Sequence, residues 1–184
     1  MKSFSLGVLL GTIAMFIFGA VFWSAPAVYR MLPAVPDEVA AGVALNAAFP
    51  NSGTYLIPNP AGDSKRVEEL SRNGPVAMVH LRREGLNPME PRVFVQGFIH
   101  ELVTVAFLAL LLKIALPALG GYLARVIFLS LLGITAALYS NFSMPVWWHH
   151  PWTFYLLSFV YDVGAWVAAA LVLAAFVKPV PEPR

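Results

Sequence analysis

One apolar stretch near the start of the chain decides the fold: residues 4–25, FSLGVLLGTIAMFIFGAVFWSA. No charged residue lies between Lys2 and Arg30. A helix of about 20 such residues, rising about 1.5 Å per residue, is long enough to cross the ~30 Å hydrocarbon core of a bilayer. The stretch therefore predicts a transmembrane helix over residues 1–26.

A cleaved signal peptide is the competing interpretation of this stretch. Lys2 would form its positively charged region, and residues 25–27, Ala-Pro-Ala, resemble a small-residue cleavage site. However, the apolar core of a signal peptide is usually only about 7–15 residues long. We therefore expect an uncleaved helix that remains in the membrane.

Three further apolar runs occupy the second half of the chain. They predict spans over residues 93–116, 122–140 and 152–177. Hydrophobic residues make up 59% of the chain and charged residues 12%, against about 45–50% and about 25% in soluble domains. The sequence thus predicts an all-α membrane protein with four transmembrane helices.

Glycines within these spans are candidates for helix packing, because a residue without a side chain lets a neighbouring helix approach closely. The candidates are Gly7, Gly11, Gly19, Gly133 and Gly164.

The segment between the first two spans, residues 27–92, has a different character. Its many prolines exclude one long helix. Pro36-Asp37-Glu38 predicts the start of a short helix that ends near Ala48. Residues 53–57 and 76–81 resemble short strands, and the mixed charges of residues 63–73 indicate a solvated loop or helical turn. We expect a small extracytoplasmic α+β cap.

The distribution of basic residues predicts the topology. Short loops on the cytoplasmic side of a membrane protein carry an excess of Lys and Arg. The loop over residues 141–152 has neither residue, so it is expected on the outer side. Both termini are therefore expected in the cytoplasm, with residues 178–184 as a disordered tail. The basic residues expected on that side are Lys2, Lys113, Arg125, Lys178 and Arg184. Lys113 and Arg125 can extend toward the headgroups and need no partner.

Several function classes are excluded or disfavoured by composition. The chain has no cysteine, which excludes disulfides, thiolate metal sites and cysteine nucleophiles. The net charge is +2 and the basic residues form no patch with aromatics, so no nucleic-acid partner is indicated. The sequence contains no nucleophile elbow, phosphate loop or dinucleotide fingerprint. A non-enzymatic role is favoured.

Two carboxylates within the predicted spans require an explanation, because charged groups inside a membrane are costly and often functional. Glu101 and Asp162 are too far from the span ends to reach water. On the second span, polar residues recur every fourth position beside Glu101, and a polar stripe also runs along the fourth span. If the two stripes face each other, they form an intramembrane polar cluster of Gln96, His100, Glu101, Thr104, Ser158 and Asp162.

The chemistry of this cluster stays open between three states. The acids are protonated, or they pair with a protonated His100, or they hold a cation. An interhelical hydrogen bond that fixes packing is the simplest role. No cofactor is predicted, but a metal or haem remains an alternative, and its candidate ligands are His100, Glu101, His149, His150 and Asp162.

The chain resembles a group of small four-span bacterial inner-membrane proteins without an established activity. The resemblance rests on residues 18–23 (FGAVFW), 53–58 (GTYLIP), Gly74-Pro75 and residues 162–166 (DVGAW). It implies a multi-pass protein of the bacterial cytoplasmic membrane, whose cap would lie in the periplasm, and it implies no particular chemistry.

The leading functional hypothesis is a non-enzymatic accessory or scaffold subunit of a membrane complex. Its partners would be the lipid bilayer and other membrane-protein subunits or further copies of the chain. The first alternative is a small proton- or cation-coupled transporter that uses the intramembrane His/Glu/Asp cluster. The second is a metal- or haem-binding membrane protein.

Overall fold

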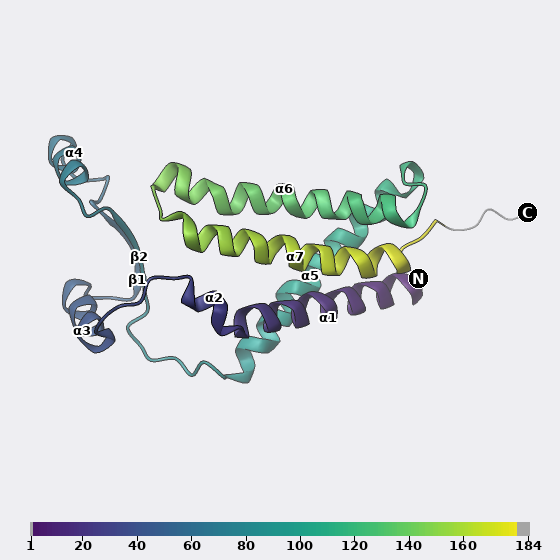
Figure 1. Cartoon of the computed structure of the whole chain (residues 1–184), viewed down its shortest axis with the longest axis horizontal. Helices are drawn as coiled ribbons and strands as arrows, with labels where there is room; N and C mark the ends of the chain where they lie inside the picture. The colour runs from purple at the N-terminus through teal and green to yellow at the C-terminus, as the bar shows by residue number, and fades with distance from the viewer. Residues whose placement is uncertain (1, 180–184) are drawn as a thin grey trace, which may run out of the picture. The chain divides into compact units, whose positions relative to one another are not determined.

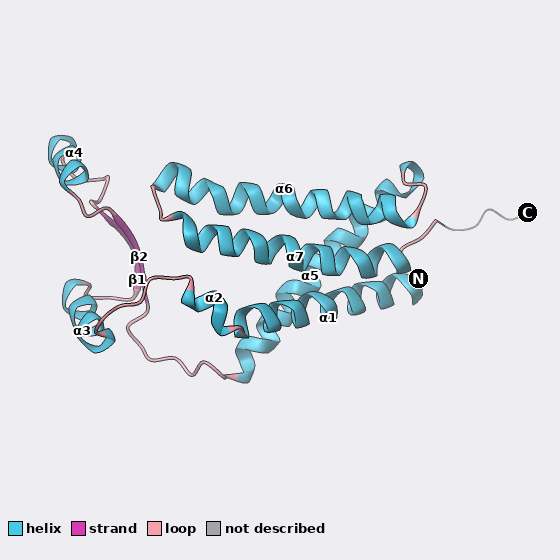
Figure 2. Cartoon of the chain, viewed as in Figure 1, coloured by secondary structure: helices cyan, strands magenta, loops and turns pink. Residues whose placement is uncertain are grey.

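A computed structural model describes residues 2–179 of the chain. It divides into two compact units, one formed by the described residues of Met1–Leu32 and Met89–Arg184, the other by Pro33–Pro88. The described chain is mostly helical, with four long apolar helices and one two-stranded sheet (Figures 1 and 2). The predicted number of long apolar helices and the small sheet are thereby confirmed.

The first unit contains the helices that are long and apolar enough to cross a membrane. The candidate spans are α1 (Lys2–Ser24), α5 (Pro91–Ala115) with the 3₁₀ turn η1 (Leu116–Ala118), α6 (Tyr122–Trp148) and α7 (Trp152–Phe176). A short helix, α2 (Pro26–Arg30), follows α1. Four helices of this length and composition fit a multi-pass membrane protein.

Helix α7 lies at the centre of this unit, with α1 along one side and α6 along another (Figure 1). Helix α5 packs along α1 and runs obliquely to the other three. The core is built from fully buried aliphatic residues that include Val105, Leu108 and Leu112 of α5 and Leu173 of α7. Helix α7 contributes mainly buried alanines, which permit close approach of its neighbours.

Each of the five glycines singled out in the sequence lies against a side chain of another helix. A Cβ added to Gly133 would lie 2.5 Å from Cβ of Trp166, and one added to Gly7 would lie 2.7 Å from Cβ of Phe176. Gly11 and Gly19 face Val105 and Tyr161 in the same way, and the Phe18 ring covers Gly164. A side chain of a neighbouring helix therefore fills the space beside each of these glycines.

Helix α6 is longer than the sequence predicts. It continues past Ser140 to Trp148, with Pro145 inside the helix, so the expected loop over residues 141–152 is reduced to a corner at residues 149–151. Proline normally ends a helix because it lacks the N–H donor. Here the residues beyond Ser140 pack against α7: Pro145 is buried, and the Phe142 ring lies 5.0 Å from that of Phe159. This packing keeps the segment helical.

The second unit is a hairpin with two helices. Helix α3 (Glu38–Ala48) begins at Asp37, whose carboxylate accepts a bond from the Ala40 N–H. Strands β1 (Gly53–Ile57) and β2 (Ala77–Leu81) pair antiparallel, with Thr54 opposite His80, and α4 (Ser64–Asn73) connects them. The segment expected as a loop or turn is thus a ten-residue helix.

The expected disordered tail falls mainly outside the described residues. Lys178 and Pro179 follow α7, and residues 180–184 are not described.

Candidate functional site

The carboxylate of Asp162, within the candidate span α7, accepts a hydrogen bond from a residue that the sequence predicted to lie in a loop. Asn141 of α6 is 7% exposed, and its Nδ2 donates a 2.7 Å hydrogen bond to Oδ2 of Asp162 on α7. The same Nδ2 lies 3.0 Å from the carbonyl oxygen of Ala137. Asp162 lies about 15 Å along α7 from Trp152, at about 1.5 Å per residue. The pair therefore joins α6 and α7 well inside the predicted span.

Glu101 of α5 is half-buried, and its oxygen Oε2 is buried without a hydrogen-bond partner among the described residues. It lies about 15 Å along α5 from Pro91, a distance similar to that of Asp162 along α7. Tyr161 of α7 directly precedes Asp162 in the sequence. Tyr161 also packs against the aromatic residues of α1, 5.5 Å from Phe22 and 5.4 Å from Trp23 between ring centroids.

The polar stripe of α5 does not turn toward α7 as the sequence analysis expected. Gln96 and His100 are both exposed on the surface of the unit, and the Thr104 hydroxyl donates to the carbonyl oxygen of His100 one turn earlier. Helix α5 packs mainly along α1, whereas α7 packs along α1 and α6. Pairing with His100, one of the three states that the sequence leaves open, is not seen for Asp162, whose carboxylate accepts a hydrogen bond from Asn141. Ser158 is half-buried on α7.

His149 and His150 lie at the corner between α6 and α7. His149 adopts a left-handed backbone conformation with φ 57° and ends α6. Nδ1 of His150 lies 2.6 Å from the hydroxyl of Tyr155, so these two side chains share a hydrogen bond. His149 is exposed and His150 is half-buried.

The candidate metal ligands are not gathered into one site. Among residues 2–179, no group of three or more His, Asp or Glu side chains is placed to hold a metal ion. His100 is exposed on α5, and His150 is bonded to Tyr155. The metal or haem hypothesis therefore gains no geometric support from the described residues.

A second polar contact, which the sequence did not predict, joins α6 to the C-terminal end of α7. Arg125 of α6 is 7% exposed, and its Nε donates a 3.1 Å hydrogen bond to the carbonyl oxygen of Ala174 on α7. The Ser3 hydroxyl of α1 donates to the carbonyl oxygen of Phe176 at 2.5 Å. The last carbonyls of a helix lack partners within the helix. Arg125 thus satisfies the end of α7 instead of extending to the headgroups.

In the second unit, polar contacts close the open end of the hairpin. The Ser52 hydroxyl donates to Oε2 of Glu84 at 2.8 Å and accepts a bond from the Arg83 N–H. Arg83 Nη1 donates to the carbonyl oxygen of Phe49, whose ring packs on Tyr55. The backbone N–H of Glu84 and the Ser52 hydroxyl hold the pKa of the Glu84 carboxyl below its ordinary value.

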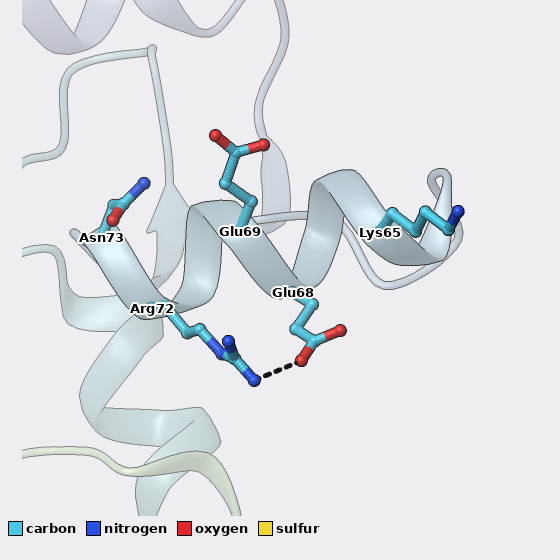
Figure 3. Close-up of a pocket in the computed structure, with 5 residues that line it drawn as sticks. All are labelled: Lys65, Glu68, Glu69, Arg72 and Asn73. Atoms are coloured by element: carbon cyan, nitrogen blue, oxygen red, sulfur yellow. Dashed lines mark hydrogen bonds and ion pairs between the residues drawn. The ribbon is translucent and has the colours of Figure 1, made fainter.

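The surface of the charged helix α4 has a shallow hollow that does not form a defined binding site. Its volume is about 230 Å³, and its lining residues are Lys65, Glu68, Glu69, Arg72 and Asn73 (Figure 3). The ion pair between Arg72 and Glu68 is exposed on both sides and spans one helical turn. Such surface pairs contribute little to stability, and we interpret this face as solvated.

Comparison with known proteins adds no assignment: family models, curated proteins and solved structures give no match to this chain.

Proposed function

We propose that this multi-pass membrane protein is a non-enzymatic assembly subunit that binds another membrane-protein chain through α5. The observation that carries the proposal is the exposure of Gln96 and His100 on a helix whose other exposed residues between Arg92 and Lys113 are apolar. Hydrocarbon offers no hydrogen bonds to these side chains, so polar groups within spans usually face other protein.

The packing of α5 supports this proposal. Its main contact in the unit is α1, and a long surface of α5 is left exposed. Large apolar residues such as Val103 and Phe107 continue the exposed face toward the cytoplasmic end and would be compatible with lipid or protein. Only the polar residues near the outer end distinguish this face from ordinary lipid-facing surface.

The second unit also supports a role in assembly. Phe49 is its single buried hydrophobic residue among the described residues 33–88. An isolated two-stranded hairpin is at best marginally stable in water. On α3, Val39 and Val43 are 79% and 66% exposed. A surface of this kind is typical of segments that become covered when a complex forms.

Photo-crosslinking in intact cells tests the proposal. A photoreactive phenylalanine analogue replaces His100 in one variant and Lys113, exposed near the opposite end of α5, in the control. We expect His100 to give an adduct of discrete mass and the control to give little. If His100 crosslinks only to lipid, the assembly role is wrong.

A second candidate function is proton or cation transport, and one observation favours it. The buried oxygen Oε2 of Glu101 has no partner among the described residues. Protonatable groups at this depth are typical of proton relays. Purified protein in vesicles with an internal pH dye tests this: transport requires proton flux that Glu101→Gln abolishes, with His80→Gln in the soluble unit as the control.

A further inference from the structure

Glu101 lies on the face of α5 that packs against α1. A Cβ added to Gly97 of α5 would lie 3.8 Å from the ring of Phe16. One turn beyond Glu101, Cγ1 of Val105 lies 3.1 Å from a Cβ added to Gly11 of α1. Residues four apart lie on nearly the same face of a helix, so Glu101 is midway between these two contacts. This position explains why its oxygen Oε2 is buried.

The helices beside Glu101 offer no positive charge to its carboxyl group. Residues 3–24 of α1 contain no charged or titratable side chain. The buried hydroxyl of Thr12 on α1 donates instead to the carbonyl oxygen of Val8. The titratable side chains of α7 are two tyrosines and Asp162, which do not carry positive charge. Within the described part of the chain, no Lys, Arg or His forms an ion pair with Glu101.

The surroundings of Glu101 do not suit a metal cation. Hard cations such as Mg²⁺ and Ca²⁺ are bound by about six or more oxygen atoms. Among residues 2–179, no group of three or more His, Asp or Glu side chains is placed to supply such ligands. A proton, in contrast, needs only one carboxyl oxygen. Of the two kinds of ion considered for transport, the proton therefore fits this site.

The energetics of burial also favour a bound proton. An ionised carboxylate without a partner is far more costly away from water than a neutral carboxylic acid, and a group in such a place is neutralised by proton uptake. Asp162 differs from Glu101 in this respect, because its Oδ2 accepts a hydrogen bond from the Asn141 amide. The two acids within the candidate spans thus have different environments.

We propose that the ion bound at Glu101 is a proton, so that Glu101 is a neutral carboxylic acid between α1 and α5. This inference rests on the second candidate function, since it names the ion that the same residue would take. It does not depend on a partner for the exposed surface of α5.

Infrared spectroscopy of the full chain at neutral pH tests the proposal. A protonated carboxylic acid has a C=O stretching band that an ionised carboxylate lacks. The protein is placed in vesicles of ether-linked lipids, which have no ester carbonyl to obscure this band. Wild type is compared with Glu101→Gln and with Asp162→Asn, the matched change of the other acid within a candidate span.

We expect a carboxylic acid band in wild type that Glu101→Gln removes and that persists in Asp162→Asn. A wild-type spectrum without the band would overturn the proposal. A band that Glu101→Gln leaves unchanged would overturn it as well, because the proton would then belong to another group.

A second measurement uses wild type alone and therefore does not depend on the folding of a variant. A lipid-soluble carbodiimide adds to a protonated carboxyl group: the carboxyl oxygen bonds to its central carbon, and the proton moves to one of its nitrogens. Glu101 is half-buried and can be reached from lipid. Peptide mass spectrometry should find the adduct on Glu101 and not on Glu68, an exposed, ion-paired acid of the second unit. An unmodified Glu101 would contradict the proposal.

Flux measurements separate this inference from the transport function. Uptake of radiolabelled sodium that Glu101→Gln abolishes, in a protein without the carboxylic acid band, would keep transport and overturn the bound proton. The band without any proton flux would leave the proton on Glu101 and remove the transport function. Absence of both the band and any flux would remove both.

Discussion

The buried amide of Asn141 donates a 2.7 Å hydrogen bond to the carboxylate of Asp162, and this contact joins the long helices α6 and α7 inside the membrane-spanning unit. The two residues are 21 positions apart, across the corner at His149. Asn141 Nδ2 also donates to the carbonyl oxygen of Ala137, so both acceptors hold the side-chain amide in place.

The first prediction concerns the free energy that this pair contributes. Asn141→Ala, Asp162→Ala and the double variant form a cycle, and we expect a coupling free energy of about 0.6 to 1.7 kcal/mol, as for other membrane hydrogen bonds. Reversible unfolding in detergent-lipid mixtures measures it. Additive effects of the two single variants would show that the pair does not stabilise the fold.

The second prediction concerns the close approach of α6 and α7 at Gly133. A Cβ there would lie 2.5 Å from Cβ of Trp166, so Gly133→Ala forces the helices apart and should cost about 1–3 kcal/mol of unfolding free energy. Thermal unfolding in detergent measures the loss. Gly120→Ala is the control, because no atom lies within 4 Å of its added Cβ. Similar stabilities for both variants would contradict the prediction.

The third prediction concerns Arg125, whose Nε bonds to the carbonyl oxygen of Ala174. Arg125→Ala leaves this carbonyl without its partner and should lower the unfolding free energy by about 1.5–3 kcal/mol, the range for hydrogen bonds to charged groups. Chemical unfolding monitored by circular dichroism measures the change. Lys113→Ala, on the exposed last turn of α5, should have little effect. An Arg125→Ala variant as stable as this control would disprove the role.

The fourth prediction concerns the pH dependence of the second unit. The Glu84 backbone N–H and the Ser52 hydroxyl lower the pKa of the Glu84 carboxyl in the folded state. Stability from this group is therefore fully present above the pKa of the unfolded chain. It is lost as pH falls through the lower, folded pKa.

Hydrogen exchange of the β1 and β2 amides, measured by mass spectrometry on the full chain, tests this. Comparison of wild type with Glu84→Gln at each pH cancels the intrinsic pH dependence of exchange. We expect slower exchange in wild type near neutral pH and equal exchange once Glu84 is protonated. A difference that persists at the lowest pH would contradict the assignment.

Local sequence patterns predicted the helices and strands well where tertiary packing did not compete with them. Helix α3 starts within the predicted Pro36-Asp37-Glu38 segment, where the Asp37 carboxylate caps it, and the strand at Gly53–Ile57 has the predicted bounds. The prediction was wrong where a local rule competed with packing. Residues 141–152 were predicted as a loop, but the helix continues to Trp148 with Pro145 buried inside it.

The candidate site was predicted only in part. Asp162 was singled out from the sequence because a carboxylate in an apolar span requires a partner. Its donor, Asn141, was missed because it was assigned to a loop, although an asparagine beside a long apolar run is itself a polar group in need of a partner. Matching stripes on two helices gives no information about which helices are adjacent.

By itself, the amino-acid sequence determined the number of long apolar helices and the polar positions within them, since both follow from hydrophobic length and from the cost of burying charge. Only the tertiary structure decided that α7 lies between α1 and α6, that Asn141 meets Asp162, and that Gln96 and His100 of α5 face outward. Helix neighbours depend on how glycines and bulky side chains such as Gly133 and Trp166 fit together in space, and that fit is not a property of any one helix.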